Sequence, residues 1–228
     1  MRIVGLSASL GVTHKRNVSY DGPPVHVPQT MPEDWTYAVH HFTDETMPLR
    51  TSMSPYLQAR IPKCYGWSLV PGGDVYVWLD ACFRLARPDA LAWLIEQLGD
   101  AHIALYAHPF RSSIHAEAAF IQQQLPQSRR LMKRYTGDRI AEWLELLDED
   151  GYQDNVLFAG GVLAYRPRAH VMRALGEWGV TNWLYTTNDQ LTLPYHLTRN
   201  AVRVSVLPGD IYHSEHLQFT REQRRSDG

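Results

Sequence analysis

The stretch VYVWLD, residues 75–80, decides the fold of this chain. Five consecutive apolar residues, β-branched and aromatic, are typical of a strand that a parallel sheet buries on both faces. A carboxylate, Asp80, follows them directly. Ligands of open α/β sheets bind beyond the carboxyl ends of the strands, so Asp80 is the first candidate for a site residue. A turn or helix-capping aspartate is the alternative interpretation.

Outward from this strand, apolar β-rich runs alternate with helical patterns. The alternation predicts an α/β fold in one domain, residues 1–220, with a mostly parallel central sheet and helices on both faces. Residues 7–32 are predicted to be a long loop and residues 221–228 a frayed tail. Strands are predicted at 3–6, 35–42, 75–79, 102–107, 156–165, 202–207 and 217–220. Helices are predicted at 88–98, 113–124, 128–135, 139–147, 169–178 and 189–198, with a helix or irregular segment at 54–65.

Composition excludes several classes of protein. The 228 residues suffice for one substantial core, and a formal charge of −2 gives no global attraction for nucleic acid or acidic membrane, although a local basic groove remains compatible with it. Two cysteines are too few for a disulfide framework, which favours a reducing cytoplasm. No apolar run approaches the ~20 residues that span a bilayer, so no membrane association is expected.

A second strand end carries further polar groups. His108 and Arg111 follow the strand at 102–107, and Glu117 lies in the next helix. A guanidinium there matches the geometry of a diphosphate, but the three side chains are equally compatible with a structural ion-pair network. Gly160 and Gly161 interrupt a strand, which indicates either a bulge or a close approach of a ligand to the backbone.

The last candidates lie towards the carboxyl terminus. Asn188 is a plausible N-cap for a helix that begins with Asp189 and Gln190, and Pro194 is expected to kink or shorten that helix. Helix starts favour anionic ligands, although Asp189 is equally compatible with an ordinary first-turn residue. His213 is a candidate metal ligand, against the alternative of an unremarkable surface histidine.

Together these segments resemble the glycosyltransferase-like family once catalogued as a domain of unknown function, which includes plant turgor-regulation and mucilage-related proteins. The order of the motifs matches as well as their content, over roughly residues 3–213. The matching segments are FTD at 42–44, ARIPK at 59–63, VWLD at 77–80, HPFRSSIHAEA at 108–118 and DQLTLPY at 189–195.

The resemblance implies a GT-A-like, Rossmann-like fold and transfer of a sugar from a nucleotide-sugar donor. Asp80 would contact the donor ribose or a cation, and Arg60 and Lys63 would neutralise the diphosphate. Asp189 and Gln190 would lie beside the anomeric carbon. His108, Arg111, Gly160 and Gly161 are further donor-binding candidates, and Asp80 and His213 are the candidate ligands of a divalent cation, Mn²⁺ or Mg²⁺. These assignments are expectations for the structure to meet.

One departure from the family pattern concerns that cation. GT-A enzymes use a DxD motif for the metal and the diphosphate, whereas this chain has Asp80-Ala81-Cys82, with cysteine at the second acidic position. Metal dependence is therefore left open. The acceptor is equally open, between a glycan, a protein, a small molecule and a modified nucleic-acid base.

Two other functions compete with glycosyl transfer. A metal-dependent phosphoesterase would use His40, His41, His108, His213 and Asp80, although the chain lacks the paired His-x-Asp or His-x-His that two-metal sites usually need. The second alternative is a sugar-nucleotide-binding module that keeps the fold and has lost catalysis.

Arg129 and Arg130 are predicted to lie on a solvated helix face, away from the donor.

Overall fold

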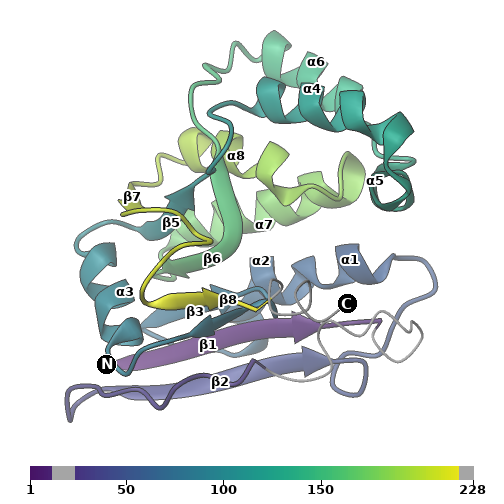
Figure 1. The fold of residues 1–228 in the computed structure, drawn as a ribbon. Coiled ribbons are helices and arrows are strands. Elements are labelled where there is room, and N and C mark those ends of the chain that lie inside the picture. Colours follow the sequence, from purple (N-terminus) through teal and green to yellow (C-terminus); the bar gives the residue numbers. More distant parts are fainter. Residues whose placement is uncertain (12–23, 221–228) are drawn as a thin grey trace.

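The computed structural model describes residues 1–11 and 24–220 of the chain. Its main sheet has six strands in the order β2-β1-β3-β6-β5-β7, and β6 alone among them runs antiparallel to its neighbours (Figure 1). The predicted α/β class with a mostly parallel sheet is therefore confirmed. The strands are β1 (Arg2–Ser9), β2 (Thr36–Thr43), β3 (Val75–Leu79), β5 (Ile103–Ala107), β6 (Phe158–Tyr165) and β7 (Val204–Leu207).

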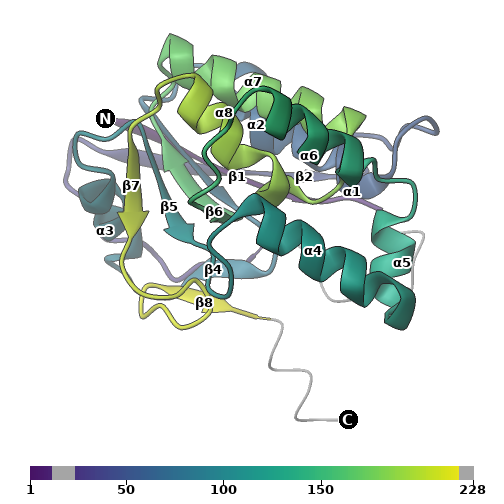
Figure 2. The ribbon, with the colours of Figure 1, turned by 90° about the horizontal axis from the view of Figure 1, so that it is seen from above.

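Helices cover both faces of this sheet, as predicted. α2 (Arg60–Leu69), α7 (Ala169–Leu184) and α8 (Leu193–Arg199) pack on one face through a core that includes Trp178. α3 (Ala90–Leu98) packs on the other. Figure 2 shows the sheet between these two layers. The remaining helices are α1 (Pro55–Gln58), α4 (Ile114–Gln124), α5 (Arg129–Tyr135), α6 (Ile140–Glu149), and the 3-10 turns η1 (Leu125–Gln127) and η2 (Asp189–Leu191).

A small second sheet pairs β4 (Phe83–Leu85) with β8 (Leu217–Phe219) in antiparallel orientation. Sequence reasoning missed β4, because a three-residue strand is too short to show a periodicity. The predicted loop at 7–32 was also too long. Residues 7–9 extend β1 and pair with β2, whereas residues 24–32 form no helix or strand, as predicted, although Val27 N donates to Leu85 O (3.0 Å). The rest of that loop, 12–23, and the predicted tail, 221–228, lie outside the described residues.

The glycine pair in β6 occupies a bulge. Leu105 of β5 pairs with Leu163, whereas the next residue, Tyr106, pairs with Ala159, so Gly160 and Gly161 fall within the shift of register. The extra residues re-aim the strand next to the carboxyl end of β3, where Asp80 N donates to Gly161 O (2.8 Å). The bulge interpretation of the glycine pair is confirmed.

The helix predicted from Asp189 is divided in two. The Asn188 side chain caps η2 by accepting from Gln190 N (3.0 Å), and the helical turn then breaks at Thr192 before α8 begins. Pro194 lies in the first turn of α8, where its missing N–H is not needed. The predicted shortening at this proline is therefore confirmed. Of the helices formed by residues 1–11 and 24–220, none combines the length and apolar composition of a membrane span.

Candidate active site

Asp80 lies at the carboxyl edge of the main sheet, where the parallel strands end. Its Oδ1 accepts from Trp78 Nε1 (2.7 Å) and lies 3.4 Å from Lys63 Nζ. The side chain is 35% exposed, so it faces solvent as well as the ammonium. The register between β1 and β3 pairs Leu6 with Trp78, so the end of β1 runs beside this carboxylate.

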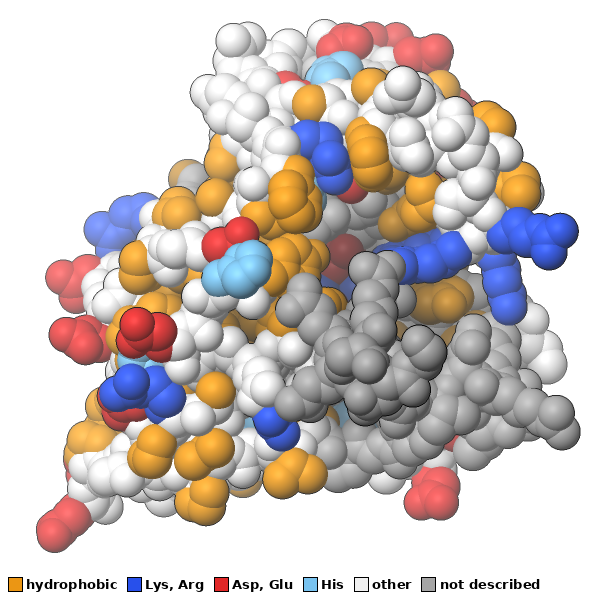
Figure 3. All heavy atoms as spheres, in the orientation of Figure 1, with side chains coloured by type: hydrophobic (Ala, Val, Ile, Leu, Met, Phe, Trp, Pro, Cys, Tyr) orange, Lys and Arg blue, Asp and Glu red, His pale blue; other side chains and the backbone are white. Residues whose placement is uncertain are grey.

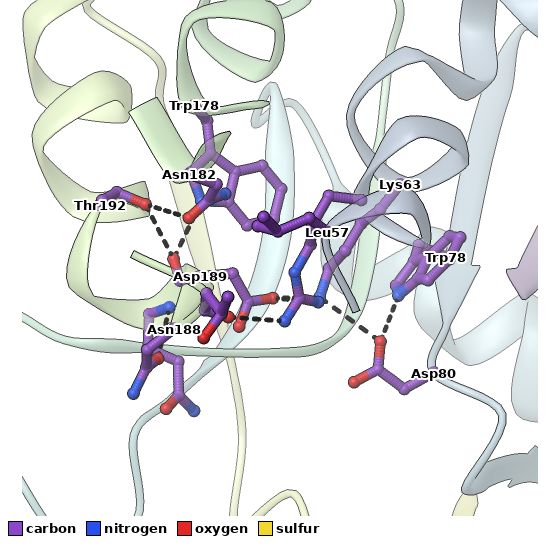
Figure 4. A network of polar contacts seen from close by, with 12 residues as sticks. Leu57, Lys63, Trp78, Asp80, Trp178, Asn182, Asn188, Asp189 and Thr192 are labelled. Atoms are coloured by element: carbon purple, nitrogen blue, oxygen red, sulfur yellow. Dashed lines mark hydrogen bonds and ion pairs between the residues drawn. The ribbon is translucent and has the colours of Figure 1, made fainter. Parts of the chain in front are cut away.

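A buried ion network lies next to Asp80 (Figure 4). Asp189 Oδ2 contacts Lys63 Nζ at 2.5 Å and Arg60 NH1 at 2.9 Å. Lys63 is fully buried, and the Asp189 side chain is 9% exposed. The ammonium of Lys63 thus joins the two carboxylates, and Arg60 contacts the same oxygen of Asp189.

Burial by itself would raise the pKa of Asp189, but the two cations outweigh burial and hold that pKa far below its usual value. Burial likewise disfavours the charged form of Arg60, whereas Asp189 and Asp80 raise its pKa above the usual value. Asp189 and Arg60 therefore both remain ionised at neutral pH. An isolated buried charge would be strongly unfavourable, so each member of the network depends on the others.

Aromatic rings and a glycine surround this network. Lys63 Nζ lies 5.6 Å from the ring centre of Trp78 and 5.5 Å from that of Trp178, and Trp178 Nε1 donates to Asp189 O (2.9 Å). A Cβ at Gly160 would stand 2.9 Å from Asp189 Oδ2 and 3.2 Å from Lys63 Nζ. Gly160 therefore provides the space in which the ion pair lies against β6.

A second polar cluster adjoins the first through the residue before Asp189. Asn188 Nδ2 donates to Glu117 Oε1 (3.3 Å), and Glu117 Oε2 accepts from Arg111 Nε. His108 Nδ1 accepts from the backbone N–H of Arg111 (3.1 Å), so its other nitrogen carries the proton and faces Glu117 at 3.9 Å. Burial and Arg111 lower the pKa of His108, and Glu117 opposes them. The net lowering favours the neutral imidazole.

The structure thus brings together Arg60, Lys63, Asp80, Asp189 and Gly160, and joins to them His108, Arg111 and Glu117 through Asn188. Gln190 is half-buried, and its side-chain amide has no hydrogen-bonding partner among the described residues. The neighbouring Gly161 faces the other way, since a Cβ there would meet Phe83 at 2.7 Å.

His213 does not join this group through any contact in the described part of the chain. It is largely exposed, and its Nδ1 lies 3.5 Å from Asp210 Oδ2. Within residues 1–11 and 24–220, no three His, Cys, Asp or Glu side chains gather at metal-binding spacing. Around Asp80 the donors are one carboxylate with an ammonium beside it, a set that does not fit a divalent cation held by protein oxygens alone. The metal role of Asp80 and His213 remains a prediction.

The histidines of the phosphoesterase hypothesis are similarly dispersed. His40 and His41 are neighbours on β2 and so point to opposite faces of the sheet. His108 contacts Glu117, and His213 contacts Asp210. These positions do not favour a two-metal centre.

Sequence reasoning missed a set of buried polar groups on β1 and β2 and at His26, which lies near His41 of β2. Ser7 and His41 are register partners, so their side chains share one face of the sheet. Both nitrogens of His41, the hydroxyls of Ser7 and Ser9, and Nε2 of His26 are buried without a hydrogen bond in the described structure. Burial, with a contribution from His41, lowers the pKa of His26 to about 4. Because unpaired buried polar groups are rare, this polar face indicates a place for a polar ligand or water.

Sequence reasoning also missed the support of the Asp189 loop. Asp138 Oδ2 accepts from Thr187 N (2.6 Å) and Thr186 Oγ1 (2.8 Å). Trp143 Nε1 donates to Leu191 O (2.8 Å). Only the spatial approach of α5 and α6 to residues 186–191 reveals these contacts, since nothing in the sequence links segments about 50 residues apart.

Comparisons with known proteins give similarity of structure alone. No family model and no curated protein matches the chain. The apo structure of mouse xyloside xylosyltransferase 1 aligns over 91% of this chain and 85% of its own, with 9% identity and a TM-score of 0.47. The apo structure of the bifunctional glycosyltransferase WbbM aligns over 75% of this chain, with 13% identity and a TM-score of 0.42. The aligned part covers 28% of the WbbM chain. Identities and TM-scores this low carry no conclusion about function, which rests on the site.

Proposed function

We propose that this chain is a glycosyltransferase that moves a sugar from a nucleotide-sugar donor to an acceptor. The observation that carries the proposal is the network Asp80–Lys63–Asp189–Arg60 at the carboxyl edge of parallel strands. Ligands of open α/β sheets bind at this edge. The resemblance of residues 59–63, 77–80 and 189–195 to glycosyltransferase-like motifs supports the same assignment.

The polar face of β1 and β2 supports a site for the donor nucleoside. Ser7, Ser9, His41 and His26 offer donors and acceptors that lack partners among the described residues, and a base or ribose would satisfy them. The end of β1 leads from there to Asp80. Asp80 Oδ1 is engaged by Trp78 and Lys63, which leaves Oδ2 for a hydroxyl of the ribose or the sugar.

Lys63 and Arg60 support the departure of the nucleoside diphosphate. In the transfer, the bond from the anomeric carbon to the diphosphate oxygen breaks, and the diphosphate leaves with the bonding electrons. The acceptor oxygen bonds to the same carbon and passes its proton to the departing diphosphate or to water. Positive charge gathers on the sugar and negative charge on the leaving group, and fixed charges on both sides lower that barrier. Arg111 is a further cation near the Asp189 loop: it contacts Glu117, to which Asn188 of that loop donates.

Asp189 fits an electrostatic and positioning role better than that of a general base. A base works best when its pKa lies near the working pH, whereas the cations hold the pKa of Asp189 far below that range. Its carboxylate also keeps Lys63 and Arg60 in place. Gln190, whose amide has no partner among the described residues, is the group we assign to a hydroxyl of the transferred sugar.

Incubation with a panel of nucleotide sugars tests the proposal, with release of nucleoside diphosphate as the readout. We expect release from one donor class, and loss of release in Asp189→Asn. Calorimetric binding of a nucleotide sugar without turnover would identify a binding module instead. Metal-dependent hydrolysis of phosphate esters, without release from any nucleotide sugar, would establish the phosphoesterase and refute the transferase.

A further inference from the structure

Helix α5 carries a concentrated basic face. The twenty residues 118–137 contain no Asp or Glu and four basic residues, in a chain whose formal net charge is −2. At about 100° per residue, Arg129, Arg130, Lys133 and Arg134 span a continuous arc of roughly 140°. The opposite side of the helix carries the buried Tyr135. We call these four cations the α5 basic face.

The first-turn half of this arrangement opposes the stability of the helix, whereas Lys133 and Arg134 lie in the last turn, where the macrodipole favours cations. Arg129 and Arg130 occupy its first turn, where the macrodipole disfavours cations, and no acidic residue lies there to compensate. The pairs Arg129–Lys133 and Arg130–Arg134 are like charges at i,i+4, which repel. Arg129 and Lys133 form no salt bridge within the described residues. Residues that lower the stability of their own helix indicate that these side chains serve a function other than folding.

The α5 basic face borders the proposed active site. Thr187 Oγ1 donates to Arg134 O (3.0 Å), and Arg60 NH2 donates to Thr187 O (3.3 Å). Thr187 thus joins the last turn of α5 to the Asp189 loop. Figure 3 shows a hollow on this side of the molecule, with Lys and Arg side chains gathered on one flank and hydrophobic side chains on the other.

Aromatic surface accompanies these charges. The Arg134 guanidinium lies 5.6 Å from the ring centre of Tyr56 and 5.2 Å from that of Tyr135, and its Nε is buried without a partner in the described structure. The Tyr56 side chain is on the surface at 46% exposure. Basic side chains that follow a backbone, next to aromatic faces on which bases stack, are the recurring elements of single-strand nucleic-acid binding.

We propose that the α5 basic face binds a single-stranded nucleic acid and presents it to the active site as the acceptor. Arginine forks match phosphate oxygens, and the strand's phosphates supply counter-charges to Arg129 and Lys133, which form no salt bridge within the described residues. A single strand suits an edge-of-sheet site because its bases are accessible without extrusion from a duplex. The assignment of the bound strand as the acceptor rests on the proposed function, whereas the binding itself does not.

Fluorescence anisotropy with the full chain tests the binding, using labelled single-stranded DNA and RNA oligonucleotides, a duplex of the same sequence, and heparin as an acidic glycan. The test variant is Arg129→Glu with Lys133→Glu. The matched control is Arg168→Glu with Arg173→Glu, which makes the same charge change at exposed positions at the start of α7. Melting curves verify that both variants are folded.

We expect the α5 variant to weaken single-strand binding at least tenfold and the control to change it less than threefold. The slope of log Kd against log salt should fall by about 1.4, because each neutralised phosphate of a single strand contributes about 0.7. Equal losses in both variants, tighter binding of the duplex, or tighter binding of heparin would each overturn the proposal. Donor hydrolysis is measured separately, so failure of binding with intact hydrolysis refutes this inference alone, and the reverse result refutes the proposed function alone.

Discussion

Replacement of Asp189 by asparagine gives the sharpest test of the ion network. The change preserves the shape of the side chain and removes the one negative charge between Lys63 and Arg60. Lys63 retains only the longer contact with Asp80, and Arg60 loses its carboxylate partner. Two buried cations then lie close together without full compensation.

The structure sets the size of the effect. Removing one partner of a buried ion pair costs about 3–5 kcal/mol, and the amide oxygen of asparagine keeps a hydrogen bond, so we expect a loss near 3 kcal/mol. For a chain of 228 residues, that corresponds to a decrease in melting temperature of roughly 6–12 °C. If Asp189 also acts on the transition state, kcat per folded molecule should fall by ~100-fold while nucleotide binding is kept.

Asp154→Asn is the matched control. Asp154 is likewise 9% exposed and accepts from Ile114 N (2.7 Å) and from His115, but it lies outside the network. We expect it to lower the melting temperature and leave kcat within about threefold. A melting temperature unchanged within 2 °C in Asp189→Asn, or equal loss of kcat in both variants, would refute the assignment.

The same variant changes the response to acid. Because the pKa of Asp189 is lower in the folded chain than in the unfolded chain, its contribution to stability is complete above the unfolded value near 4 and is lost as pH falls below it. The difference in unfolding free energy between the wild type and Asp189→Asn should therefore shrink as denaturation is measured from pH 6 down to pH 3. A constant difference over that range would contradict the depressed pKa.

Three other substitutions test the remaining parts of the site. Asp80→Asn should strongly reduce turnover of the nucleotide sugar with the fold kept, since the side chain is partly exposed; full turnover in a folded variant would exclude it from the mechanism. Arg60→Ala should raise the donor KM more than Arg129→Ala does, and equal donor KM values would contradict the diphosphate role. Gly160→Ala should lower the melting temperature, at a cost of about 1–3 kcal/mol, because its Cβ would meet the ion pair. Gly176→Ala, whose Cβ would meet Tyr65 at an ordinary 3.5 Å, should not lower it, and equal melting temperatures would argue against the close fit at Gly160.

The sheet and its helices could be predicted from the sequence because each element carries its own local signal. The run at 75–79 is apolar throughout, and Ser113 and Ser128 cap the helices that follow them. Local signals also located Asp80 at a strand end. They failed for β4, whose three residues show no period, and for β1 beyond Leu6, where serines replace apolar residues.

The site itself could be predicted only as a set of separate candidates. Lys63 and Asp189 are 126 positions apart, and no pattern along the chain indicates that their charges touch. The family resemblance assigned Lys63 to a diphosphate, whereas in the structure its nearest partner is Asp189. The unpaired groups of the polar face were equally invisible, since a buried hydroxyl without a partner is a property of packing.

The position of β6 has a consequence for the order in which the chain acquires its structure. β6 lies between β3 and β5 and pairs with both, although it follows β5 by some fifty residues. Until the ribosome has released residues 158–165, β3 and β5 each present an unpaired edge, the kind of edge that invites association with other chains. Gly160 arrives on the same strand and makes room for the contact between Lys63 and Asp189. Insertion of β6 therefore joins β3 to β5 and brings Gly160 into place, whereas the ion network forms only when Asp189, which is released later, reaches Lys63. A chain arrested between residues 165 and 189 would have the joined strands without the network.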